Sequence, residues 1–204
     1  RGARVAILWL NYPHNPTGAF APPETFQQAI ELAHRYGFLL CHDAPYMDVT
    51  FDGSQPMSIL QFPGAREVAV EFNSLSKTYN MSGWRLGLAC GNALAVQALA
   101  NLKGNVDSGH FQPALLAGAA ALEGDQTWLA ARNEVYRVRR DAVLAALPAL
   151  GLSARVPQGT LYVWAALPPG TTSMDYADRL LEATGVSVTP GLAFGQHGEG
   201  YVRL

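Results

Sequence analysis

Two short apolar runs, at residues 5–10 and 38–41, flank a segment of helical periodicity, and this order most constrains the fold. Between the runs, Phe26, Ile30 and Ala33 recur at helical spacing. A continuous apolar run is typical of a parallel strand covered on both faces, and a crossover helix usually connects such strands. The sequence therefore predicts an α/β fold, with a mostly parallel sheet and helices on both faces.

The pattern changes along the chain. Further elements of the sheet layer are predicted as strands at 68–72 and 86–90 and as helices at 93–102 and 113–122. A long helix at about 126–147 would span about 30 Å at ~1.5 Å per residue, enough to join two domains. Later elements are predicted as strands at 161–167, 186–189 and 201–204 and as a helix at 174–183. We therefore expect a partial large domain at 1–136 and a partial small α+β domain at 137–204.

Composition excludes several classes of partner. The 204 residues carry a net charge of −2, so the chain lacks the excess of cations that a nucleic acid would need. No stretch approaches the roughly 18 consecutive apolar residues of a membrane span. Cys41 and Cys90 lie in or beside apolar runs, where free thiols behave as small apolar groups, and this favours a cytoplasmic location. The sequence opens at Arg1 beside a strand-like run, so we interpret it as a fragment of a longer protein.

Polar motifs follow three of the apolar runs: N-P-T-G at 15–18, D-x-x-Y at 43–46 and S-x-S-K at 74–77. In open α/β sheets, ligands bind beyond the carboxyl ends of the strands, so these motifs are expected to share one site. A lysine that forms an imine must be neutral part of the time, which partial burial and a nearby cation favour. Arg85 follows Lys77 by eight positions and could supply that cation, or bind a phosphate with a two-pronged contact. The pattern points to a pyridoxal phosphate enzyme.

In this order, the motifs resemble those of the class I and II aminotransferases, which share the type I fold of pyridoxal phosphate-dependent enzymes. The resemblance covers essentially the whole chain, because residues 190–204 also resemble the end of the family's small domain. It implies pyridoxal 5'-phosphate as cofactor, no metal, and transfer of an amino group between an amino acid and a 2-oxo acid. It also implies a homodimer.

The resemblance implies a cofactor contact for each matching residue. Asp43 would keep the cofactor's ring nitrogen protonated, and the side chains of Tyr46 and Asn15 would contact its phenolic oxygen. Ser74 and Arg85 would bind its phosphate.

The resemblance also implies the catalytic and substrate-binding residues. Lys77 would join the cofactor as an internal aldimine and then serve as the general base. Arg203 would hold the α-carboxylate of the substrate, with Asn15 beside it.

Several neighbouring residues receive other predictions. The Asn15–Pro16 bond is a candidate cis peptide, because only bonds before proline adopt that isomer readily. His42 points to the face opposite Asp43 and is predicted to pack rather than to react. Tyr162 and Trp164 are predicted to be core aromatics.

Alternatives remain open at this point. A C–S β-lyase uses the same fold and motifs but releases pyruvate and ammonia. An aminotransferase-like effector domain of a transcription regulator would carry a DNA-binding domain before Arg1, and a structural fragment would bind no cofactor. Among the aminotransferases, segments 48–53 and 107–109 look most like the diaminopimelate and alanine types.

Overall fold

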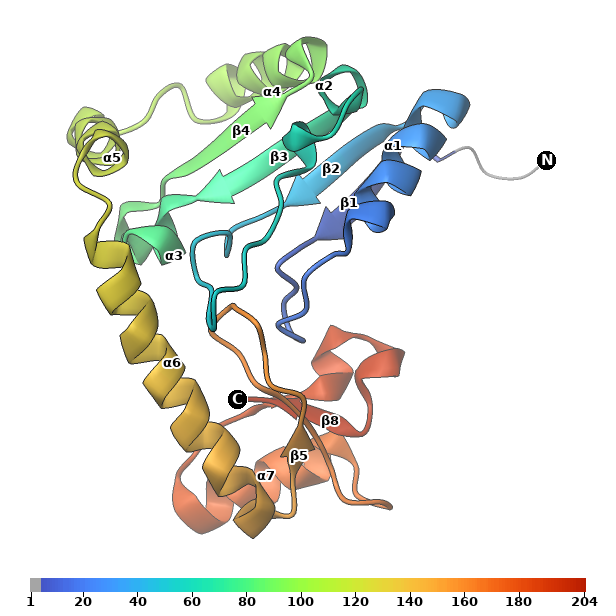
Figure 1. Ribbon diagram of the computed structural model, residues 1–204, viewed down its shortest axis with the longest axis vertical. Coiled ribbons are helices and arrows are strands. Elements are labelled where there is room, and N and C mark those ends of the chain that lie inside the picture. The colour runs from blue at the N-terminus through green and yellow to red at the C-terminus, as the bar shows by residue number, and fades with distance from the viewer. Residues whose placement is uncertain (1–4) are drawn as a thin grey trace.

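The computed structural model describes residues 5–204, which form two lobes joined by a long helix (Figure 1). The larger lobe is built on a four-stranded sheet in the order β1-β2-β3-β4, with β1 (Ile7–Asn11), β2 (Leu39–Asp43), β3 (Ala69–Ser74) and β4 (Gly87–Gly91). The strands β1, β2 and β3 are parallel, and β4 runs antiparallel to β3. The predicted α/β class with a mostly parallel sheet is confirmed.

Helices connect and flank these strands: α1 (Pro23–Tyr36), α2 (Ala65–Val68), α3 (Leu75–Thr78), α4 (Ala93–Val106) and α5 (Gln112–Glu123). Helix α1 begins at Pro23, which is tolerated there because a residue in the first turn needs no N–H for a hydrogen bond within the helix. The helix ends before Gly37, which adopts the left-handed conformation with φ 68°. Phe26 and Ala33 of α1 are buried against Leu40 of β2 in the main core. The helical spacing seen in the sequence thus marks the face of α1 that packs on the sheet.

The two faces of the sheet differ in their cover. Successive side chains of a strand point to opposite faces, so Ile7 and Trp9 lie opposite the face that α1 covers. These two side chains are 49% and 58% exposed, and the Trp9 ring lies 5.4 Å from the ring of Phe72 on β3. Within residues 5–204, no helix buries this part of the second face.

Helix α6 (Trp128–Ala146) runs from the larger lobe to the smaller one (Figure 1). It corresponds to the long helix that the sequence predicts at about 126–147. The smaller lobe contains helix α7 (Ser173–Thr184) and an antiparallel sheet in the order β5-β6-β8-β7, with β5 (Ser153–Ala154), β6 (Trp164–Ala166), β7 (Thr189–Pro190) and β8 (Tyr201–Arg203). Its core includes Leu152, Val163 and Val202. The α+β character of this lobe agrees with the prediction, although its strands are shorter. The domain boundary at 136/137 falls inside α6 and stays a prediction.

None of the helices in the described part of the chain is long and apolar enough to cross a bilayer.

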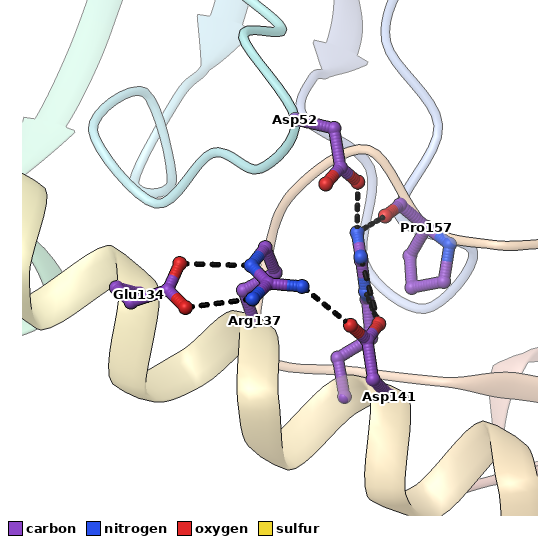
Figure 2. A network of polar contacts seen from close by, with 6 residues as sticks. Asp52, Glu134, Arg137, Asp141 and Pro157 are labelled. Carbon is purple, nitrogen blue, oxygen red and sulfur yellow. Dashed lines mark hydrogen bonds and ion pairs between the residues drawn. The ribbon is translucent and has the colours of Figure 1, made fainter.

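A network of ions on α6 ties the two lobes together (Figure 2). The buried guanidinium of Arg140 donates to the Asp52 carboxylate at 2.6 Å and to the Pro157 carbonyl at 3.1 Å. Asp52 follows β2 in the larger lobe, whereas Pro157 lies between β5 and β6 of the smaller lobe. The side chain of Arg140 therefore contacts both lobes and the helix between them.

Replacement of Arg140 by methionine is expected to lower the free energy of unfolding by about 1–3 kcal/mol, because a buried carbonyl and a carboxylate lose their donor. Asp52 is itself half exposed, which limits the electrostatic part of the loss. The measurement is urea denaturation of the whole protein. Arg139→Met, at an exposed position on the same helix, serves as the control and should change stability by less than about 0.5 kcal/mol. Equal losses of stability in the two variants would contradict a role of Arg140 in joining the two lobes.

Candidate active site

The carboxyl ends of β1, β2 and β3 meet at one edge of the larger sheet, and that edge faces the smaller lobe (Figure 1). Asn11 at the end of β1 is paired with Asp43 at the end of β2, and Asp43 is paired with Phe72 on β3. The loops that follow these strands carry the three polar motifs. The sheet register therefore places the motifs side by side, as the sequence predicted.

Asp43 presents a half-buried carboxyl group at this edge. Its Oδ2 accepts a hydrogen bond from Asn11 Nδ2 at 3.0 Å, and among residues 5–204 no hydrogen bond reaches its Oδ1. Burial raises the pKa of the Asp43 carboxyl above its ordinary value, while the charge of neighbouring His42 opposes that rise. A cation placed against the open oxygen would stabilise the carboxylate. The arrangement suits a protonated ring nitrogen.

Asn15, Tyr46 and Arg203 come together, although the first and last are 188 positions apart. Arg203 Nη1 donates to Asn15 Oδ1 at 2.9 Å, and its guanidinium carbon lies 4.3 Å from the centre of the Tyr162 ring. The hydroxyls of Tyr46 and Tyr162 are 2.8 Å apart. Burial raises the pKa of the Tyr46 hydroxyl, and its hydrogen bond with Tyr162 adds to the rise. The Tyr46 hydroxyl thus stays protonated at neutral pH. The Asn15–Pro16 bond is cis, as predicted.

The prediction that Tyr162 and Trp164 are core aromatics is wrong. Both are partly exposed. Tyr162 stands between Tyr46 and Arg203, and Trp164 stacks on Tyr201 with ring centres 5.2 Å apart. Sequence reasoning missed the site contact of Tyr162 because its partner Tyr46 is 116 positions away.

Ser74 is the last residue of β3, and Lys77 lies in the segment that follows it. Ser74 Oγ accepts from the backbone N–H of Ser76 at 3.2 Å, and Lys77 sits half-buried in the single turn of α3. Alternation along β3 puts Ser74 on the same face as Phe72, and therefore on the face of Asp43. The structure thus brings Ser74 and the lysine turn to the same edge as Asp43.

Arg85 does not contact Ser74 directly. Its guanidinium Nη1 donates to the Ser82 carbonyl at 3.0 Å, and its side chain is exposed. Its backbone is left-handed, with φ 56°, at the turn that leads into β4. Ser74 is paired with Gly87, two residues after Arg85, so both predicted phosphate ligands lie near the same end of the β3–β4 hairpin.

His42 packs on the face opposite Asp43, as predicted. The fully buried imidazole contacts Glu71 Oε2 at 3.0 Å and the Tyr12 carbonyl at 2.9 Å. Burial raises the pKa of the Glu71 carboxyl, but hydrogen bonds from His42, Ser58 and Asn73 outweigh it and hold the pKa below its ordinary value. The stability that this carboxylate contributes is present above its unfolded pKa and lost as pH falls through the lower folded pKa. The network supports the strands under the site at neutral pH.

Arg132 on α6 holds the lysine turn and was not singled out by the sequence. The buried guanidinium donates to the carbonyl of Lys77 at 2.9 Å, to that of Asp48 at 2.6 Å, and to that of Thr78. The Thr78 hydroxyl also donates to the Asp48 carboxylate at 2.8 Å. These contacts fix the Lys77 main chain to the loop that follows Tyr46.

A cavity of about 280 Å³ lies between α6 and the smaller lobe, and Tyr162 is the residue it shares with the site. Neither Lys77 nor Asp43 lines it, so it is separate from the strand-end edge. In the part of the chain that the structure describes, no group of three or more His, Cys, Asp or Glu side chains could hold a metal ion.

Residues 1–204 match the family described as aminotransferase class I and II. The chain belongs to this family. It is 49% identical over 201 residues to the LL-diaminopimelate aminotransferase of Moorella thermoacetica, which covers 98% of this chain and 52% of that protein. It is 48% identical to the enzyme of the same name from Dehalococcoides mccartyi, with 99% and 52% covered.

Solved structures agree with this membership of the aminotransferase family. BacF of Bacillus subtilis matches with a TM-score of 0.93 at 38% identity, covering 98% of this chain and 51% of that one. A probable N-succinyldiaminopimelate aminotransferase of Thermus thermophilus matches with a TM-score of 0.90 at 40% identity, covering 98% and 53%. The chain spans about half the length of the curated relatives it matches.

Proposed function

We propose that the whole protein is a pyridoxal 5'-phosphate-dependent aminotransferase, which moves an amino group between an amino acid and a 2-oxo acid. The observation that carries the proposal is the contact of Arg203 with Asn15, beside Tyr46 and Asp43, at the strand ends that precede the Lys77 turn. Membership of the family supports the same reaction.

The residues present fit the proposed cofactor. When bound, pyridoxal phosphate supplies an electron sink for the pair released when a bond to the substrate's Cα breaks. The open Oδ1 of Asp43 would accept a hydrogen bond from the ring nitrogen and keep it protonated. The Tyr46 hydroxyl and the Asn15 amide would donate to the phenolic oxygen. Ser74 and Arg85 would bind the phosphate, because a hydroxyl and a guanidinium both donate to a dianion.

Arg203 and Lys77 act on the substrate. The planar guanidinium of Arg203 binds the α-carboxylate through two parallel hydrogen bonds, which fixes the direction of the Cα–H bond. Two aromatic rings help to hold the guanidinium in place, since its carbon lies 4.3 Å from the Tyr162 ring centre and 4.8 Å from that of Phe194. Lys77 Nζ then takes the proton from Cα as a general base.

We propose LL-diaminopimelate as the amino acid, because the two relatives described above bear the name LL-diaminopimelate aminotransferase at 48–49% identity. Segments 48–53 and 107–109 look like both the diaminopimelate and the alanine types, which is consistent with this choice. A homodimeric state and a cytoplasmic location, both expected from the sequence, stay predictions.

The test is reconstitution of the whole protein with pyridoxal phosphate, followed by borohydride reduction and peptide mass spectrometry. We expect a visible absorbance band and the mass of the reduced cofactor on the peptide that contains Lys77. Loss of LL-diaminopimelate should then depend on an added 2-oxo acid.

Other outcomes would identify the alternatives. Release of pyruvate and ammonia from a sulfur amino acid, without need of a 2-oxo acid, would indicate a β-lyase. Cofactor binding without turnover would favour the effector domain of a regulator. Absence of the band would contradict the proposal.

A further inference from the structure

Asn11, the last residue of β1, contacts two residues assigned above to the cofactor site. Its Nδ2 donates to Asp43 Oδ2 at 3.0 Å and to the Asp43 carbonyl at 2.9 Å. Its Oδ1 accepts the backbone N–H of Asn15 at 2.9 Å. One half-buried amide group thus bridges the end of β2 and the turn that contains Asn15.

These contacts continue to the substrate side of the site. The Asn15 side chain accepts a hydrogen bond from Arg203, so an unbroken series of contacts runs from Asp43 through Asn11 and Asn15 to Arg203. The group proposed to face the ring nitrogen and the group proposed to bind the carboxylate therefore share one support.

An amide is the side chain that suits this position. Asn offers two N–H donors and a carbonyl acceptor, and all three functions are used here. Leucine has the same bulk but neither donor nor acceptor. Aspartate would replace the donor with a second carboxylate against Asp43, which like charges disfavour.

The contact also fixes the orientation of the Asp43 carboxyl group. Because Oδ2 is held by Asn11, the carboxyl cannot rotate freely, and Oδ1 is left without a hydrogen bond from residues 5–204. The backbone of Asp43 is held from the same side, since its carbonyl also accepts the N–H of Tyr12 at 3.2 Å.

We propose that Asn11 is a positioning residue of the aminotransferase site: its amide aims the Asp43 carboxylate at the cofactor's ring nitrogen and holds the Asn15 turn against Arg203. The inference rests on the proposed function. Asn11 itself touches neither cofactor nor substrate. Its loss acts through Asp43, which becomes a weaker and less directed acceptor for the ring nitrogen.

The test compares the whole protein with its Asn11→Leu and Asn11→Ala variants. We expect both variants to bind pyridoxal phosphate about ten-fold more weakly, as loss of a hydrogen bond to a charged group predicts. We also expect the pH midpoint of the bound cofactor's absorbance to rise by about one unit, because a less protonated ring nitrogen withdraws less charge. A residue that merely supports the fold would leave that midpoint in place.

Asn73→Leu is the matched control. Asn73 is also a strand-end asparagine whose amide donates to a carboxylate, Glu71 Oε1 at 2.9 Å, but on the other face of the sheet. The pH midpoint of the cofactor absorbance in Asn73→Leu is expected to stay within about 0.2 unit of that of the parent, a shift well below one pKa unit. Should the leucine variant at position 11 fail to fold, the smaller alanine variant decides.

Failure of this inference differs from failure of the proposed function. A parent protein without the cofactor band would overturn both. A parent with the band, and Asn11 variants that share its midpoint and cofactor affinity, would overturn only the positioning role of Asn11.

Discussion

Replacement of Lys77 by alanine in the whole protein is expected to remove the visible absorbance of bound cofactor and to lower kcat by at least about 10⁴-fold. The loss is large because one amine is assigned two tasks, the covalent attachment of the cofactor and proton transfer at the substrate's Cα. The second task alone contributes about 10²–10⁴-fold in enzymes generally. Absorbance spectra and single-turnover kinetics measure the two losses separately.

Lys103→Ala is the control for this change. Lys103 lies on α4 with half of its side chain exposed, paired with Asp107 at 2.9 Å, and its loss should leave turnover unchanged. Small primary amines added to Lys77→Ala should restore part of the proton transfer, because they replace the missing base. Turnover at the parent rate in Lys77→Ala would remove this lysine from the mechanism.

The sequence predicted the larger lobe well because its elements are determined by local patterns. The apolar runs at 5–10 and 38–41 became β1 and β2 with ends shifted by about two residues. The parallel pairing of these strands follows from the crossover helix between them, and the pairing then places Asp43 beside Asn11. Local pattern and strand register together therefore brought the three motifs to one edge.

Local sequence patterns could not predict the contacts between segments that are far apart in the chain. Tyr162 looked like a core aromatic because it lies in an apolar run, and only the packing of the two lobes shows its hydroxyl against Tyr46. Arg132 on α6 belongs to no motif that the sequence analysis singled out, yet its guanidinium is buried against backbone carbonyls 54 to 84 positions away. Backbone acceptors carry no sequence signal, so a charged group that binds them cannot be recognised from residue type.

The site residues differ in how far local sequence could place them. Asp43, Tyr46 and Lys77 stand in short motifs at strand ends, where the strand pattern predicts a shared edge and the family resemblance predicts their roles. Asn11 directly precedes the N-P-T-G turn region, but its bridging role depends on the register of β1 and β2, which no single segment encodes.

Replacement of Asp43 by asparagine is expected to lower kcat/KM by roughly 100-fold or more, because a hydrogen bond between charged groups is exchanged for a neutral one. The change keeps the shape of the side chain and removes only its charge. Asp125→Asn, in the exposed turn before α6, is the control and should leave kcat/KM unchanged.

The same substitution should not weaken the fold of the cofactor-free protein. Burial raises the pKa of the Asp43 carboxyl. An acid whose pKa is higher in the folded state than in the unfolded state lowers the free energy of unfolding once it ionises. This loss of stability is present at neutral pH and absent in acid. Asp43→Asn removes that cost, and its Tm without cofactor is expected to equal or exceed that of the parent at pH 7. Thermal unfolding with and without pyridoxal phosphate measures these Tm values. The cofactor should raise the Tm of the parent strongly, and that of the variant less. A carboxylate that disfavours the empty protein yet is needed by the loaded one is a group held in place for its ligand. A variant that lost activity and cofactor-free stability together would instead make Asp43 a structural residue.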